Sequence, residues 1–193
     1  MYPALKTVRK SGNEKFKNTD KNIILSDFWS WAYSDLIGNT ERGKLAEYIV
    51  ATAINAENDL TDSFAKYDLV TNNGIKIEVK SSGYIQSWYQ TEYSKIVFNI
   101  PKTFGWDEKT NSYSTIKERQ SDVYVLCVHK HKDQDTLNPL DISQWDFYVL
   151  PTKLINTYCE NAKTVTLSKA LKIGAVKCEY SEIKNCIEEL SCI

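Results

Sequence analysis

A turn formed by Asn72, Asn73 and Gly74 constrains the fold more than any other feature, because strand-like runs lie on both sides of it. In residues 75–80 (IKIEVK) apolar and charged side chains alternate strictly, which is the period of a half-buried strand. Residues 67–71 supply the second run, and an Asn-Gly turn between two such runs indicates a β-hairpin. We therefore expect two antiparallel strands and a three-residue loop, with Gly74 in the left-handed backbone conformation.

The loop length decides which side chains share a face of this hairpin. A three-residue loop pairs Val70 with Lys76. In the same register Asp68 lies opposite Glu78, and Leu69 stays on the apolar face. A two-residue loop would instead place Leu69 among the charged residues. Because a slip of one residue exchanges the two faces, burial favours the first register.

The favoured register brings two carboxylates together. Like charges directly opposite each other destabilise a strand pair, and a divalent cation would remove the conflict between Asp68 and Glu78. Lys80 follows Glu78 on the same face, where its ammonium group can orient water and stabilise charge that builds on a phosphate. Glu47, on a predicted helix, adds a third acid that can assist. The pattern predicts phosphodiester hydrolysis with Mg²⁺ or Mn²⁺ as the cofactor.

A simpler interpretation of the same residues remains open. Residues 75–80 can form an amphipathic strand with a solvated charged face, and Asp68 can be a solubilising residue beside a turn. The combination of residues favours a catalytic site. A glutamate on a helix is followed by an aspartate, a turn and a Glu-x-Lys sequence whose register matches that of the aspartate.

Helical patterns lie on both sides of this strand-rich middle. We expect a helix from Ser26, with Asp27 in its first turn, to Gly38, and a second helix from residue 39 or 40 to about residue 57. Residues 101–120 are polar and are expected to be irregular. Further strands are predicted at 95–100, 123–128 and 145–150, and further helices at 152–159, 168–173 and 181–190. This order predicts an α/β fold with a central mixed β-sheet flanked by helices.

Composition and length describe one domain with little net charge. The chain has 193 residues and a formal net charge of -1, which argues against a protein that coats nucleic acid through bulk charge. Residues 1–22 are expected to form a basic arm, which is either a solvated terminus or a phosphate-contacting segment. Residues 1–10 lack the apolar core of a secretory signal, and no run approaches the roughly 20 apolar residues that span a bilayer. These features predict a cytoplasmic protein with reduced cysteines and no membrane partner.

Three segments together resemble the PD-(D/E)xK nuclease superfamily, which has the restriction-endonuclease-like fold: residues 42–47 (RGKLAE), 66–70 (KYDLV) and 77–82 (IEVKSS). Tyr67 stands where the superfamily often has proline. The resemblance implies a metal bound by Asp68, Glu78 and the backbone carbonyl of Val79. It also implies that Lys80 is the catalytic lysine and Glu47 the acid from the preceding helix. The positions that it assigns to substrate binding are Lys44, Ser81, Ser82 and Gln86.

These observations predict a single nuclease domain over residues 1–193, a Mg²⁺-dependent endonuclease that cleaves DNA in a restriction or defence role. One chain carries one active centre, so cleavage of both strands of a duplex predicts a homodimer with two-fold symmetry. The alternatives with the same chemistry are a repair nuclease, a junction resolvase and an exonuclease. A further alternative is a catalytically silent module that binds nucleic acid. Trp88, Tyr89 and Tyr93 either pack in the core or an interface, or stack on bases.

Overall fold

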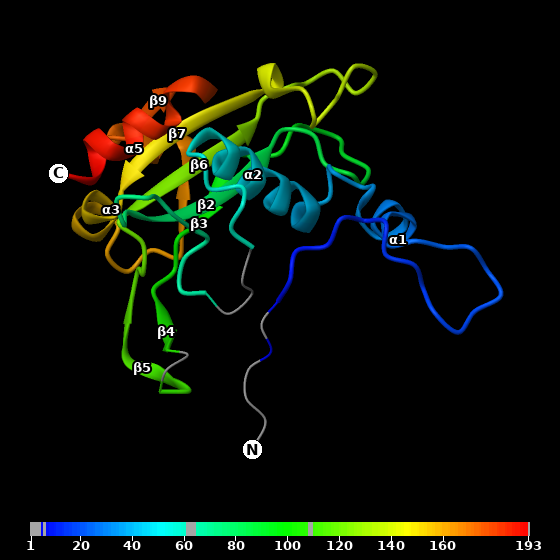
Figure 1. The fold of residues 1–193 in the computed structure, drawn as a ribbon. Coiled ribbons are helices and arrows are strands. Elements are labelled where there is room, and N and C mark those ends of the chain that lie inside the picture. Colours follow the sequence, from blue (N-terminus) through cyan, green and yellow to red (C-terminus); the bar gives the residue numbers. More distant parts are fainter. Residues whose placement is uncertain (1–4, 6, 61–64, 108–109, 193) are drawn as a thin grey trace.

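A five-stranded mixed β-sheet forms the centre of the computed structural model, which describes residue 5 and residues 7–60, 65–107 and 110–192 (Figure 1). The strand order is β1-β2-β6-β7-β9, in which β2 and β6 are parallel and the other neighbours are antiparallel. The predicted α/β fold with a central mixed sheet is confirmed. The strands are β1 (Leu69–Val70), β2 (Lys76–Gly83), β6 (Val123–His129), β7 (Trp145–Pro151) and β9 (Val176–Cys178).

Two helices cover one face of the sheet, α2 (Asn39–Ala53) and α5 (Ile183–Ser191). Ile49 of α2 and Ile187 of α5 belong to one buried cluster with the sheet residues Ile77 and Val79. The apolar half of the predicted hairpin therefore faces α2. A short 3-10 turn, η2 (Tyr180–Glu182), leads into α5, and α2 ends at Ala53, a turn earlier than predicted.

The opposite face is covered by a small two-stranded sheet and two short helices. The sheet pairs β3 (Val97–Asn99) with β8 (Thr164–Thr166), and the helices are α3 (Thr152–Tyr158) and α4 (Leu167–Lys172). Phe98 and Ile155 pack there against Leu126 of β6. All seven residues of β6 are buried because elements cover both of its faces, which explains its continuous apolar sequence.

Residues 101–120 are not irregular as predicted. They contain β4 (Thr103–Asp107) and β5 (Ser112–Glu118), which pair as an antiparallel ribbon that projects from the sheet (Figure 1). The prediction was wrong because every residue of β5 is exposed, so the segment has no apolar alternation. The register also shifts between Phe104 and Trp106.

The N-terminal helix, α1 (Leu25–Tyr33), differs from its prediction at both ends. It begins before Ser26, and Asp27 accepts a hydrogen bond from the Ile24 N–H at 2.8 Å. It ends at Tyr33 and not at Gly38, and none of its residues is buried. Residues 1–4 and 6 of the predicted basic arm lie outside the described residues, and the remainder leads into α1 at one side of the molecule (Figure 1).

Other exposed aromatic side chains lie beyond the C-terminal end of β2. Trp88, Tyr89 and Tyr93 are all exposed, so their assignment to the core was wrong. Their assignments to an interface or to base stacking remain predictions.

A further 3-10 turn, η1 (Ile142–Gln144), precedes β7. Within the described part of the chain, no helix has the length and apolar character needed to cross a membrane.

Candidate active site

The hairpin adopts the register that its loop length predicted. Leu69 pairs with Ile77 and Val70 with Lys76, and Gly74 has a φ of 83°. The turn is closed by Thr71, whose carbonyl accepts the Gly74 N–H at 2.8 Å. β1 has only two residues, so the edge of β2 beyond Ile77 is not paired by this strand.

Asp68 occupies this edge, immediately before β1. Its backbone N–H donates to the Ile77 carbonyl at 3.0 Å, and its Oδ2 accepts the Val79 N–H at 2.8 Å. The carboxylate is thereby fixed against the backbone of β2 beside Ile77 and Val79, the residues on either side of Glu78. This bond uses Oδ2 and leaves Oδ1 as an oxygen that can face a cation.

The backbone of Val79 faces the same side. Bonding groups alternate along a strand, and the N–H and C=O of one residue point to the same edge. Lys76 faces β6, because its carbonyl accepts the Asp122 N–H at 2.8 Å, whereas Val79 faces Asp68. The Val79 carbonyl therefore points toward the Asp68 side of β2, as a metal-ligating role requires.

Glu78 and Lys80 project from the face of β2 opposite to Ile77 and Val79. The Lys80 Nζ lies 2.6 Å from Glu78 Oε1, and the two side chains are 29% and 22% exposed. Burial raises the pKa of Glu78, and the nearby charge of Asp68 raises it further, whereas Lys80 opposes the shift. In the folded protein, burial and the charge of Asp68 thus both disfavour the ionised form of Glu78.

Glu47 reaches the same group of charges from α2. Its Oε2 lies 2.6 Å from the Nζ of Lys44, one turn earlier on the helix. Burial raises the pKa of Glu47, the hydrogen bond from Lys44 opposes this shift, and the charge of Asp68 adds to it. Lys80 also acts on Glu47 electrostatically. The four predicted catalytic residues, Glu47, Asp68, Glu78 and Lys80, therefore interact with one another electrostatically.

Two hollows lie beside the segment that carries Asp68. Glu47 and Asp68 line a hollow of about 230 Å³, together with Lys44 and Tyr67. Glu78 and Lys80 line a second hollow of about 190 Å³, which we term the Glu78 cleft. None of its other lining residues was assigned to the site from the sequence: Lys66, Asn99, Pro101, Thr103, Arg119, Gln120 and Tyr124.

The residues that were missed come from separate parts of the chain. Only Lys66 had a local indication, since it lies two residues before Asp68. Tyr124 is the partner of Glu78 in the β2–β6 ladder, and burial raises the pKa of its phenol, so it remains a protonated hydrogen-bond donor in the cleft. Asn99 and Gln120 reach the cleft through the tertiary fold alone.

The donor set fits a hard divalent cation. Asp68 and Glu78 offer carboxylate oxygens and Val79 a carbonyl oxygen, which are the ligand types that Mg²⁺ and Mn²⁺ prefer. Among the described residues, no three acidic, His or Cys side chains gather closely enough to form a complete metal cluster. Mg²⁺ usually keeps waters and takes one or two carboxylates with substrate phosphate, so the acid pair suffices.

The positions assigned to substrate binding lie in different surroundings. Lys44 is exposed beside Glu47 and lines the same hollow. Ser81 is half-buried and Ser82 is buried. Gln86 is 8% exposed, and its amide accepts from Arg42 Nη1 at 3.0 Å and donates to the Gly83 carbonyl at 2.8 Å. Gln86 thus connects α2 to the end of β2, and its contact with substrate remains a prediction.

Asp68, Glu78 and Lys80 lie near the edge of a mixed sheet. Two acids and a lysine are the residue types that a hydrolytic site of an α/β enzyme uses. A model of the bacteriophage T4 endonuclease IV family matches residues 3–169, which is most of the chain. The chain therefore belongs to the bacteriophage T4 endonuclease IV family, and the expectation of a nuclease is confirmed at the level of the family. A comparison with curated proteins found no match.

Proposed function

We propose that this chain is a DNA endonuclease that requires Mg²⁺ or Mn²⁺ and uses the catalytic arrangement of the PD-(D/E)xK superfamily. The observation that carries the proposal is the 2.8 Å bond from the Val79 N–H to Asp68 Oδ2. It fixes the Asp68 carboxylate to the strand that carries Glu78 and Lys80, and these residues line two hollows beside that strand. Membership of an endonuclease family supports the same chemistry.

Asp68, Glu78 and the Val79 carbonyl would hold the cation. When bound, the cation neutralises charge on the phosphate and makes water a stronger nucleophile. In the hydrolysis, the water oxygen forms a bond to phosphorus and the ester P–O bond breaks. The leaving oxygen takes up a proton from the water and becomes a hydroxyl group. Lys80 presents its positive charge in the Glu78 cleft, where it would stabilise the negative charge that develops on phosphate oxygens.

Glu47 would assist from the hollow that it lines with Asp68. Its carboxylate interacts electrostatically with Asp68 and is paired with Lys44, so it can orient water or support the cation. A role in restriction or defence, and a homodimer that cuts both strands, remain predictions from the sequence.

A digest of several substrates tests the proposal. Supercoiled plasmid, linear duplex, single-stranded DNA, branched DNA and RNA are incubated with Mg²⁺, with Mn²⁺ or with chelator. We expect metal-dependent nicking of closed circular DNA by the wild type and none by Asp68→Asn. Glu189→Gln, which removes an exposed acid on α5, is the matched control and should cleave normally. Cleavage that persists in chelator, or cleavage confined to free ends or RNA, would contradict the proposal.

A further inference from the structure

The β4–β5 ribbon is exposed to an unusual degree for a pair of strands. Phe104, Tyr113 and Ile116 are 45%, 62% and 71% exposed, and no residue of β5 is buried. A ribbon of two strands gains little from burial on its own and is marginally stable in water. Large apolar side chains displayed together on such an element are typical of a surface that meets a partner.

One face of the ribbon combines aromatic rings with a positive charge. Trp106 and Tyr113 are cross-strand partners whose ring centroids lie 4.9 Å apart in a T-shaped contact. Phe104 pairs with Lys117, whose Nζ lies 4.9 Å from the centroid of the Phe104 ring. Rings that can stack on bases, beside an ammonium that can meet a phosphate, are the chemistry with which proteins hold nucleic acid.

The base of the ribbon forms part of the Glu78 cleft. Thr103 begins β4, Gln120 follows β5, and both line the cleft together with Lys80. Gln120 Nε2 also donates to the Thr103 carbonyl at 3.1 Å, which closes the base. At Gly105 a Cβ would lie 2.7 Å from Oε1 of Gln120 and 3.1 Å from Cδ of Lys66, so the absent side chain leaves room for both residues beside the cleft.

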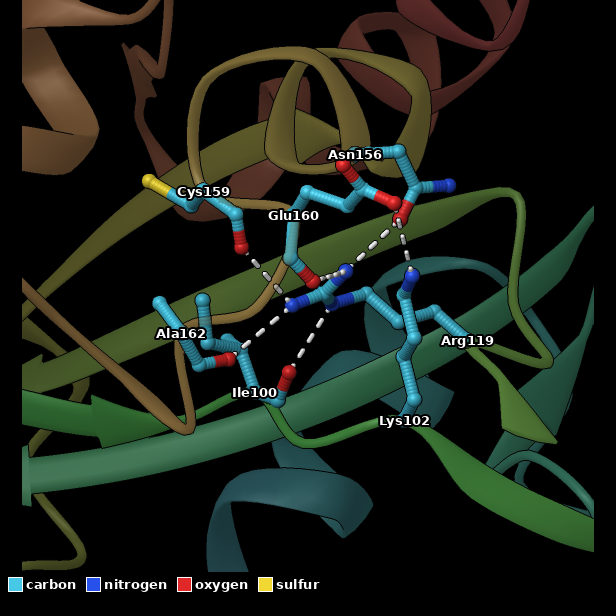
Figure 2. A network of polar contacts seen from close by, with 7 residues as sticks. All are labelled: Ile100, Lys102, Arg119, Asn156, Cys159, Glu160 and Ala162. Carbon is cyan, nitrogen blue, oxygen red and sulfur yellow. Dashed lines mark hydrogen bonds and ion pairs between the residues drawn. The ribbon is translucent and has the colours of Figure 1, made fainter.

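Arg119 fixes this base to the body of the protein (Figure 2). The residue is 6% exposed and follows β5 directly. All five of its N–H groups are matched by hydrogen bonds, so the guanidinium is fully satisfied. The acceptors are the carbonyls of Ile100, Cys159, Glu160 and Ala162, at 2.8, 3.1, 3.3 and 3.1 Å, and Oδ1 of Asn156 at 2.7 Å.

We propose that the β4–β5 ribbon binds the DNA that flanks the cleaved phosphate, an inference that rests on the proposed nuclease function. A nucleic acid whose phosphate lies in the Glu78 cleft passes Thr103 and Gln120 and meets the ribbon next. A two-stranded ribbon is also narrow enough to enter a major groove. A second copy of the chain could cover the same aromatic face, but only the substrate accounts for the position of the ribbon at the cleft.

Affinity measurements on ribbon variants test the inference. DNA binding is measured by fluorescence anisotropy without divalent metal, so that no DNA is cleaved, for the wild type, Tyr113→Ala and Lys117→Gln. Tyr113→Ala should raise Kd on the order of 10-fold, since it removes a stacking surface. Lys117→Gln should lower the slope of log Kd against log salt by about 1, because one phosphate contact is lost. Matched controls on other elements, Tyr158→Ala and Lys172→Gln, should leave both quantities unchanged.

Cleavage kinetics separate this inference from the proposed function. If the wild type cleaves DNA with Mg²⁺, the ribbon variants should raise KM and leave kcat unchanged. Wild-type cleavage with ribbon variants that bind DNA normally would overturn the ribbon inference alone. Loss of self-association in Tyr113→Ala by sedimentation, with DNA affinity unchanged, would assign the surface to a second copy and also overturn it. A wild type that neither binds nor cleaves DNA would overturn the proposed function.

Discussion

The hydrogen bond between Val79 and Asp68 leads to a prediction that separates the structural role of Asp68 from its chemical role. Asp68→Ala removes the acceptor of the Val79 N–H, and Val79 is only 5% exposed. An unpaired buried donor costs about 1–3 kcal/mol, and because Asp68 is half-buried and water can reach it, we expect about 1–2 kcal/mol. For a chain of this size each kcal/mol lowers Tm by roughly 2–4 °C, so Asp68→Ala should lower Tm by about 2–8 °C.

Asp68→Asn should behave differently in the same assay. The amide oxygen can still accept the Val79 N–H, and the change removes a negative charge that acts on Glu47 and Glu78. Without metal, its Tm should equal or exceed that of the wild type. A cation at 100 times its Kd should raise the wild-type stability by about 2.7 kcal/mol and leave Asp68→Asn unchanged. Calorimetry at neutral pH, with and without Mg²⁺, checks both points, and equal melting of the Ala and Asn variants would refute the reasoning.

Three further predictions follow from the same contacts. Lys80→Ala should lower kcat on the order of 100- to 1000-fold with little change in Tm, and cleavage at the wild-type rate would remove Lys80 from the mechanism. Because the pKa of Glu78 is raised in the folded protein, its proton stabilises the metal-free fold at acid pH and this stability is lost as pH rises. The Tm of Glu78→Gln relative to wild type should therefore increase between about pH 4 and neutrality, and a flat difference in calorimetry would contradict this. Arg119→Lys cannot satisfy five acceptors and should lower the free energy of unfolding by about 2–4 kcal/mol in urea titrations, whereas an unchanged value would show that the anchor contributes nothing.

The centre of the site could be predicted because its determinants are local. The alternation of residues 75–80 and the loop at Gly74 set the register, in which Leu69 pairs with Ile77 and Val70 with Lys76 as predicted, and Asp68 follows at the same edge of β2. Glu47 comes from a different element, so no register could place it; its helical position suggested an assisting acid, and the resemblance to a known nuclease pattern gave it the same role. The structure brings Glu47 into electrostatic contact with Asp68.

The periphery of the site could not be predicted, because its residues have no local pattern. β5 is exposed on both sides, so its sequence lacks the alternation that marks a strand. β8 (Thr164–Thr166) and β9 (Val176–Cys178) have three residues each, which is too short for a period to be recognised. Arg119 looks like one more surface charge in the sequence, and its burial depends on carbonyls of the residues that directly follow β3 and α3.

The aromatic residues of α1 show a related limit. The spacing of Phe28, Trp29 and Trp31 is typical of a helix, but it does not show which side of the helix is covered. Trp31 is 84% exposed, and no residue of α1 is buried. Periodicity indicates an amphipathic element, whereas the partner that covers it is decided elsewhere in the chain or in another molecule.

The rate of plasmid nicking against Mg²⁺ concentration, compared for the wild type, Glu78→Gln and the surface control Glu189→Gln, tests the central claim most directly. We expect saturable, metal-dependent nicking by the wild type and by Glu189→Gln, and no nicking by Glu78→Gln at any concentration, with all three proteins folded by circular dichroism. Nicking by Glu78→Gln at the wild-type rate and with the same metal dependence would show that cleavage does not depend on the acid pair.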